Sequence, residues 1–260
     1  MLTVQGAVAT AFACSGLTEF FQVPLPYQHE ATVALLVCFC LLHSAREWGP
    51  GRAALFLALV YAAVTLAEGF AAELLFGLYV FTQDCTLGPH VLFGRPLFVP
   101  MAWYCCSYPA LCIAQSLVAN GLSKKVLLAS LLTMANNVVV DPFMSHLGSS
   151  WWVTRVPAPE WIWNVSESTL VFQGVPLRNF CGWFLVSLVY FGSFAVLAPE
   201  ALRRRVRHPR SVLGASLCIA LFWTAHPRHA LATRLSALLC LLVPVLAAIA
   251  QHNDSREKLR

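Results

Sequence analysis

The sequence predicts an all-α protein, a polytopic integral membrane helix bundle with about eight (seven to eight) transmembrane helices. Of its 260 residues, 58% are hydrophobic and only 11% are charged, whereas soluble domains carry roughly 25% charged residues. Apolar runs of roughly the length that crosses a bilayer recur along the chain, separated by loops that hold the basic residues. We expect residues 1–260 to form a single transmembrane domain.

The expected helices are apolar on all sides, which is typical of helices that face lipid or one another. They cover residues 3–23, 30–45, 52–76, 96–119, 124–141, 180–199, 210–225 and 234–251, and a basic tail follows at 252–260. Because lysine and arginine concentrate in cytoplasmic loops, their distribution predicts a multi-pass protein with both termini in the cytoplasm. The basic run 203–210 is interpreted as an anchor at the lipid headgroups. We expect no nucleic-acid partner, because the basic residues behind the net charge of +5 lie in these loops.

The ten cysteines indicate neither a disulfide framework nor a metal site. No C-x-x-C or Cys/His spacing is typical of zinc, so we expect no metal. Cys85 and Cys181 flank the expected outer face and remain an open candidate for pairing. The histidines, including His43 and His208, are interpreted as loop or interface residues.

Glu68 and Asp141 lie inside segments that are otherwise apolar. A carboxylate at bilayer depth is costly, and it usually faces the protein interior and has a functional role. Each lies sixteen residues beyond the basic residue that opens its helix, Arg52 (68 − 52) and Lys125 (141 − 125). Both therefore lie roughly 24 Å from the inner face. We expect the two carboxyl groups to share one apolar pocket near the outer end of the hydrocarbon core.

Other polar residues are expected near the same level. Asn137 precedes Asp141 by four residues, so both side chains point to one face of a helix. Pro142 predicts that this helix ends at Asp141, because proline pushes the preceding residue out of the helical conformation. Arg178 and Asn179 open the next helix on the same side of the membrane.

Structural roles are the alternative for each of these residues. Asp141 would then only close a helix at the headgroups, and Glu68 would form a buried hydrogen bond to a neighbouring helix. Asn136 and Asn137 would hold helices together, as polar residues do in membranes. Arg178 would pair with a carboxylate or a lipid phosphate.

Several short motifs occur in a specific order between residues 68 and 183. They are Glu68-Gly69, Phe76-Gly77-Leu78-Tyr79, Leu87-Gly88-Pro89, Gly94-Arg95-Pro96-Leu97, Pro100-Met101-Ala102-Trp103, Tyr108-Pro109-Ala110, Asp141-Pro142-Phe143-Met144 and Gly174-Val175-Pro176-Leu177-Arg178-Asn179-Phe180-Cys181-Gly182-Trp183. In order and spacing, they resemble the carotenoid-biosynthesis family of polytopic membrane proteins that includes the bisanhydrobacterioruberin and γ-carotene hydratases.

The resemblance implies a hydro-lyase that adds water to the terminal double bond of an acyclic carotenoid. A carboxylic acid in an apolar pocket can stay protonated and act as the acid, and Glu68 or Asp141 fits this role. Asn137 would orient the water. The expected substrate-binding residues are Tyr79, Trp103, Tyr108, Arg178, Asn179 and Trp183. The implied partners are a carotenoid or other isoprenoid lipid and membrane lipids, with no cofactor.

One departure from the family pattern affects the expected chemistry. A Trp-Asp pair commonly precedes the Asp-Pro of the family, whereas this chain has Asn136 and Asn137. An asparagine keeps the shape of the aspartate and loses the ionisable group. The alternatives are therefore a catalytically altered or inactive lipid-binding relative and a proton-coupled membrane transporter. The transporter is the weaker alternative because the chain lacks visible duplicated halves.

Overall fold

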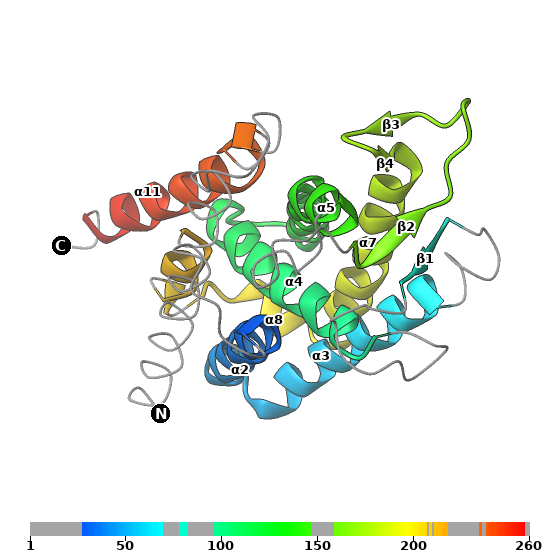
Figure 1. Cartoon of the computed structure of the whole chain (residues 1–260). Helices are drawn as coiled ribbons and strands as arrows, with labels where there is room; N and C mark the ends of the chain where they lie inside the picture. The colour runs from blue at the N-terminus through cyan, green and yellow to red at the C-terminus, as the bar shows by residue number, and fades with distance from the viewer. Residues whose placement is uncertain are drawn as a thin grey trace.

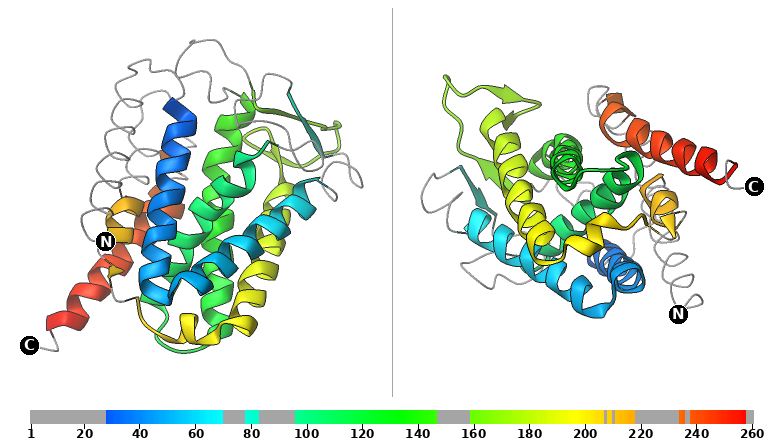
Figure 2. Two further views of the ribbon diagram at one scale, coloured as in Figure 1. Left: turned by 90° about the horizontal axis from the view of Figure 1, so that it is seen from below. Right: turned by 180° about the vertical axis from the view of Figure 1, so that it is seen from behind.

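The computed structural model is a bundle of helices with a few short strands at one end (Figures 1 and 2). It describes residues 28–69, 78–82, 96–146, 159–206, 208–209, 211–217, 234–235 and 238–257. Five long helices build the bundle: α2 (Gln28–Trp48), α3 (Pro50–Val64), α4 (Phe98–Leu117), α5 (Leu122–His146) and α7 (Leu177–Leu197). The short helix α8 (Pro199–Arg203) follows α7, and α11 (Val243–Glu257) lies at one side of the bundle.

The packing of these helices sets which side chains can meet. Helix α5 packs against α4 and α7, while α3 packs against α2, α4 and α7. Figure 2 shows the strands at one end of the bundle and α8 at the other, so we call these the strand end and the α8 end. Helices α4 and α7 start at the strand end, whereas α5 starts at the α8 end.

Aromatic side chains fill the space between α3, α4 and α7. Phe56 of α3 is fully buried and contacts the rings of Tyr104, Tyr190 and Phe194, with centroid distances of 5.7, 6.3 and 4.9 Å. Each aromatic pair contributes about 0.5–1.5 kcal/mol beyond the burial of its area. This core holds α3 in place about three helical turns before Glu68.

Among the described residues, three helices are long and apolar enough to cross a membrane. They are Pro50–Gly69, Leu122–His146 and Leu177–Leu197. The all-α class and the membrane association predicted from composition are confirmed at this level. The number of seven to eight spans stays a prediction, since helix 3–23 lies outside the described residues.

Proline 142 does not end its helix, so that prediction is wrong. Helix α5 continues through Pro142 to His146. The side chains of Ser145 and His146 bond the carbonyl oxygens of Asp141 and Pro142, both at 2.7 Å, and so occupy two acceptors of the last turn. Proline is tolerated inside membrane helices where neighbouring groups satisfy the backbone. Asp141 therefore lies inside the helix and does not close it.

Other predicted boundaries shift at the helix ends. The predicted helix 180–199 divides into α7 and α8 after Leu197, and the predicted helix 234–251 consists, from Leu238 onward, of a π-helical turn (Leu238–Leu242) and α11. Because α11 extends to Glu257, most of the expected basic tail is helical. Of the predicted helix 210–225, residues 211–217 are described and helical.

Two small antiparallel sheets lie at the strand end, where the sequence predicts only long connections. Strand β1 (Tyr79–Phe81) pairs with β2 (Trp161–Trp163), so that Tyr79 lies opposite Trp163. Strand β3 (Val171–Phe172) pairs with β4 (Val175–Pro176), directly before α7. The first sheet joins the two long connections, although they are about eighty residues apart in the sequence.

Candidate functional site

Asp141 is a buried carboxyl group in α5 near the strand end. Its side chain is 2% exposed. The amide nitrogen of Asn179, in the first turn of α7, donates a hydrogen bond to Asp141 Oδ2. Helices α5 and α7 pack against each other. The hydrogen bond between Asn179 and Asp141 therefore joins two neighbouring helices, although the two residues are 38 positions apart in the sequence.

Glu68 reaches the same region from α3. Residues 65–69 continue α3 as one π-helical turn, and Glu68 lies half-buried in this turn. Its charge acts on the Asp141 carboxyl group, so the two carboxyl groups are within electrostatic reach of each other. π-Helical turns occur frequently at functional sites. The two carboxyl groups are thus within electrostatic reach of each other, and the apolar pocket that they are expected to share stays a prediction.

Asn137 is the most unusual member of this cluster. It lies one turn before Asp141 and is fully buried, and its amide lies close enough to act on the Asp141 carboxyl group. Neither its nitrogen nor its oxygen has a hydrogen-bond partner of normal geometry among the described residues. The neighbouring Asn136 instead donates to the Leu132 carbonyl of its own helix, at 2.9 Å. We call Glu68, Asn137, Asp141 and Asn179 the acidic site.

A pair of stacked tryptophans lies beside the acidic site. The rings of Trp103 and Trp183 are 3.5 Å apart between centroids and 14° from parallel, and both are buried. Trp183 lies one turn beyond Asn179 on the same face of α7. Cys106, one turn beyond Trp103 in α4, is within electrostatic reach of Asp141. The stacked pair therefore lies at the level of the carboxyl groups, and α4 completes a site built from four helices.

The other predicted binding residues lie elsewhere. Tyr79 is buried in β1, where its ring packs against Trp163 at 5.1 Å between centroids. Arg178 is exposed and donates to the backbone oxygen of Asn164 at 3.2 Å. Cys181 is exposed, and Cys85 lies outside the described residues, so their pairing stays a prediction.

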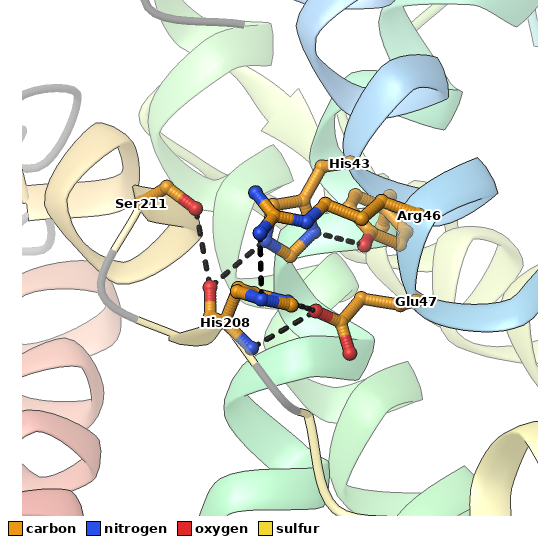
Figure 3. Close-up of polar contacts among 6 residues, drawn as sticks. His43, Arg46, Glu47, His208 and Ser211 are labelled. Carbon is orange, nitrogen blue, oxygen red and sulfur yellow. Dashed lines mark hydrogen bonds and ion pairs between the residues drawn. The ribbon is translucent and has the colours of Figure 1, made fainter. Parts of the chain in front are cut away.

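Tyr108 belongs to a second polar cluster, whose members His43, Arg46, Glu47 and His208 are labelled in Figure 3. Its hydroxyl contacts His43 Nδ1 at 2.5 Å. His43 and Glu47 lie one turn apart on α2, and Glu47 Oε1 contacts His208 Nδ1 at 2.8 Å. Arg46 contacts the other ring nitrogen of His208, Nε2, at 2.7 Å. We call His43, Arg46, Glu47, Tyr108 and His208 the histidine network.

The direction of each hydrogen bond in the histidine network follows from its donors. His43 Nε2 lies 2.9 Å from the backbone oxygen of His208, which can only accept, so this nitrogen carries the proton. His43 Nδ1 is then the acceptor for the Tyr108 hydroxyl. Arginine can only donate, so His208 Nε2 accepts from Arg46 and Nδ1–H donates to Glu47. In this arrangement each histidine has one ring nitrogen that donates and one that accepts.

The interpretation of His43 as a loop or interface residue is wrong, because its side chain is completely buried in α2. The sequence did contain one indication of this cluster: His43, Arg46 and Glu47 are three and four residues apart, so they share one face of a helix. That face meets Tyr108 of α4 and the backbone at His208. The sequence alone offered no sign of those two partners.

Taken together, these features define a membrane-associated helical bundle with a buried acidic site at one end. A family model described as "Carotenoid biosynthesis protein" matches residues 29–250, which is most of the chain. The chain belongs to this family, and the resemblance stated from its motifs is confirmed. No curated protein and no solved structure matches the chain. Family membership assigns the protein to carotenoid biosynthesis and implies an isoprenoid lipid substrate.

Proposed function

We propose that the protein is a carotenoid hydratase, which adds water to the terminal double bond of an acyclic carotenoid end group. The observation that carries this proposal is the acidic site: Asp141 is buried, bonded to Asn179 and within electrostatic reach of Glu68. An isolated alkene is a weak base, so its protonation requires a strong acid in a fixed position. Two carboxyl groups that share a buried site hold one proton more readily than two negative charges.

Asp141 is the proton donor in this mechanism. Asn179 donates to Oδ2, so the proton of the neutral acid is on the other oxygen, Oδ1. Transfer of this proton to the less substituted alkene carbon leaves a tertiary carbocation on the neighbouring carbon. The bond to Asn179 then stabilises the carboxylate that remains.

In this mechanism, the stacked rings of Trp103 and Trp183 stabilise the positive charge of the carbocation. Tryptophan offers the most favourable ring for a cation, and the attraction is about 2 kcal/mol or more in a desolvated site. Each ring lies about one helical turn from a residue that acts on or bonds Asp141, Cys106 on α4 and Asn179 on α7. This stabilisation acts only when the cation forms, and such interactions raise the rate of the chemical step.

Water completes the reaction at the cation. Its oxygen bonds to the tertiary carbon, and one of its protons passes to Glu68, which serves as the base. Asn137 cannot take this proton, but its amide, which has no normal hydrogen bond within the described part of the chain, can orient the water through one donor and one acceptor. Return of the proton from Glu68 to Asp141 restores the starting state, so no cofactor enters the balance.

The lipid substrate fits the proposed membrane topology. We propose a multi-pass arrangement with both termini in the cytoplasm, in which the strand end faces outward. A carotenoid dissolves in the hydrocarbon core and reaches the acidic site laterally between helices, while water enters from the surface. Tyr79 and Arg178 stay proposed binding residues, although they lie apart from the acidic site in separate contacts. Tyr108 bonds His43 in the histidine network, and the predicted role of Tyr108 in substrate binding stays a prediction that the variant Tyr108→Phe tests.

Expression in a bacterium that makes lycopene or γ-carotene tests the proposal. We expect hydroxylated pigment by mass spectrometry, with heavy oxygen incorporated from labelled water and none from labelled dioxygen. Glu68→Gln and Asp141→Asn should each abolish the product. Incorporation from dioxygen would refute hydration, and full product from both variants would refute the assignment of the acid and the base.

One alternative predicts another result in the same strain. An inactive lipid-binding relative would leave the pigment unchanged while retaining carotenoid on purification. The unpaired Asn137 is the feature that favours this reading, because it stands where the family pattern commonly has aspartate. Asn137→Asp would then create product where the natural chain forms none.

A further inference from the structure

A cavity of about 580 Å³ opens at the α8 end, away from the acidic site. It lies between the connection from α4 to α5 and the end of α8. Its walls are Ala119, Asn120, Gly121, Leu122, Ser123, Lys125 and Arg203. Because α5 is a candidate membrane span that starts at Leu122, the cavity lies at one end of that span.

Lys125 is a buried cation in the wall of this cavity. It is 2% exposed, and its ammonium group donates one hydrogen bond, to the Leu202 carbonyl oxygen at 2.8 Å. No carboxylate pairs with it among the residues that the structure describes. An ammonium group has three donors, and a buried charge is costly unless it is paired. Arg205 adds a further positive charge within electrostatic reach.

Arg203 lines the cavity from the other side, at the end of α8. Its side chain is exposed, and Glu200 on the same short helix is 3.8 Å from Arg52 in an ion pair. Glu200 does not belong to the cavity wall. Lys125 and Arg203 therefore both belong to the wall of the cavity, and no acidic residue does.

The backbone in the cavity wall favours an anion as well. Gly121 has a φ of +97°, a left-handed conformation that suits glycine and turns the chain into α5. The backbone N–H groups of Leu122 and Ser123 open the helix, where such groups have no acceptor within the helix. This helix end adds partial positive charge to that of Lys125 and Arg203.

We propose that this cavity binds a phosphate group, carried by an acidic phospholipid or by a small solute. Lys125 and Arg203 contact the phosphate from opposite sides, and the Ser123 hydroxyl donates from the start of α5. The bound anion supplies the charge that Lys125 lacks, and it ties the α4–α5 connection to α8. This site is independent of the hydratase chemistry at the strand end.

Thermal unfolding of the purified full chain in neutral detergent tests the site. The probes are dihexanoyl phosphatidic acid, inorganic phosphate and, as a zwitterionic control, dihexanoyl phosphatidylcholine. A ligand that binds only the folded protein raises the melting temperature with its concentration. We expect phosphatidic acid to stabilise the protein and phosphatidylcholine to have no effect. Stabilisation by inorganic phosphate as well would identify a solute phosphate as sufficient, whereas its absence would identify the lipid.

Matched variants separate this site from the general basic surface. Arg203→Gln should weaken the apparent affinity about tenfold, since a charge-assisted hydrogen bond is lost. Arg204→Gln removes the same charge one residue further, outside the cavity wall, and should change the affinity less than about twofold. Lys125→Gln and its exposed neighbour Lys124→Gln form a second pair with the same expectation. If Lys125→Gln does not fold, the comparison of Arg203→Gln with Arg204→Gln still tests whether the cavity binds phosphate.

Two outcomes would overturn the proposal. One is equal weakening by Arg203→Gln and Arg204→Gln, which would indicate attraction to the basic surface as a whole. The other is the absence of stabilisation by either phosphate probe at millimolar concentration.

Discussion

The acidic site and the histidine network are both polar clusters in the helical bundle, but they differ in how fully their groups are bonded. In the histidine network, all four ring nitrogens of His43 and His208 have partners. In the acidic site, both side-chain atoms of Asn137 lack a normal hydrogen bond among the described residues, as does the Thr65 hydroxyl in the turn of Glu68. A buried polar group without a partner costs about 1–3 kcal/mol.

This contrast distinguishes polar groups that are buried for stability from polar groups that are buried for function. A fully bonded network stabilises the packing of helices and leaves no donor or acceptor for a ligand. An unpaired amide beside a carboxyl group retains both for water or substrate, and proteins tolerate such a cost mainly at functional sites. We therefore assign the chemistry to the strand end and a structural role to the histidine network.

Removal of the proposed acid should have the largest effect. Asp141→Asn keeps the shape and the contact with Asn179 but cannot supply the proton, so product formation should fall about 10²–10⁴-fold. Hydroxylated pigment per amount of folded protein measures this effect. Glu167→Gln, which neutralises an exposed carboxylate at the same end, should leave the product unchanged. Equal losses from both variants would contradict a specific role for Asp141.

Asn137→Leu should separate activity from stability. Loss of an amide that orients water should lower the rate about a hundredfold, while the unfolding free energy should stay equal or rise by about 1 kcal/mol because an unpaired polar group is removed. Pigment analysis and thermal unfolding in detergent measure the two effects. Asn136→Leu is the matched control and should leave the rate unchanged. A large loss of stability in Asn137→Leu would show that the amide has a partner after all.

Tyr108→Phe should have the opposite effect to Asn137→Leu, lowering stability while leaving activity unchanged. It removes the donor to His43 Nδ1 and leaves a buried acceptor unpaired, which should lower the unfolding free energy by about 1–3 kcal/mol. Activity per folded molecule should remain. The control is Tyr61→Phe, because Tyr61 is half-buried and its hydroxyl has no bond among the described residues. If Tyr108→Phe abolishes product without loss of stability, Tyr108 binds substrate as the sequence predicts.

Trp183→Phe should have the smallest effect. Phenylalanine keeps an aromatic face but offers a weaker attraction for a cation, so we expect about a tenfold decrease in rate. Trp163→Phe, in the sheet formed by β1 and β2, removes the same indole ring from another aromatic cluster and should not change the rate. Equal rates in the two variants would remove the stacked pair from the mechanism.

Much of the site was predictable from helix geometry. The distances along the sequence from Arg52 to Glu68 and from Lys125 to Asp141 are equal, and the structure brings the two carboxyl groups into electrostatic reach. The four-residue spacing placed Asn137 on the face of Asp141. These arguments need only the rise and the period of a helix, which are local properties.

Other features depended on contacts between distant segments. Helix α5 continues past Pro142 because packing and side-chain bonds near its end outweigh the local preference of the residue before proline. The pairing of β1 with β2 joins two connections that the sequence presents as separate loops. His43 is buried because Tyr108 and the backbone at His208 meet its ring.

The sequence by itself determined the helical class, the membrane association and the family, because composition, apolar runs and ordered motifs are properties of the chain read in one dimension. Only the tertiary structure decided that Asn179 bonds Asp141, that Arg178 instead bonds the backbone of Asn164, and that the Asn137 side chain has no normal hydrogen bond among the described residues. The reason is physical: the rotation of each helix about its axis, and its shift along its neighbours, follow from how the aromatic core around Phe56 packs, and no local pattern contains that information.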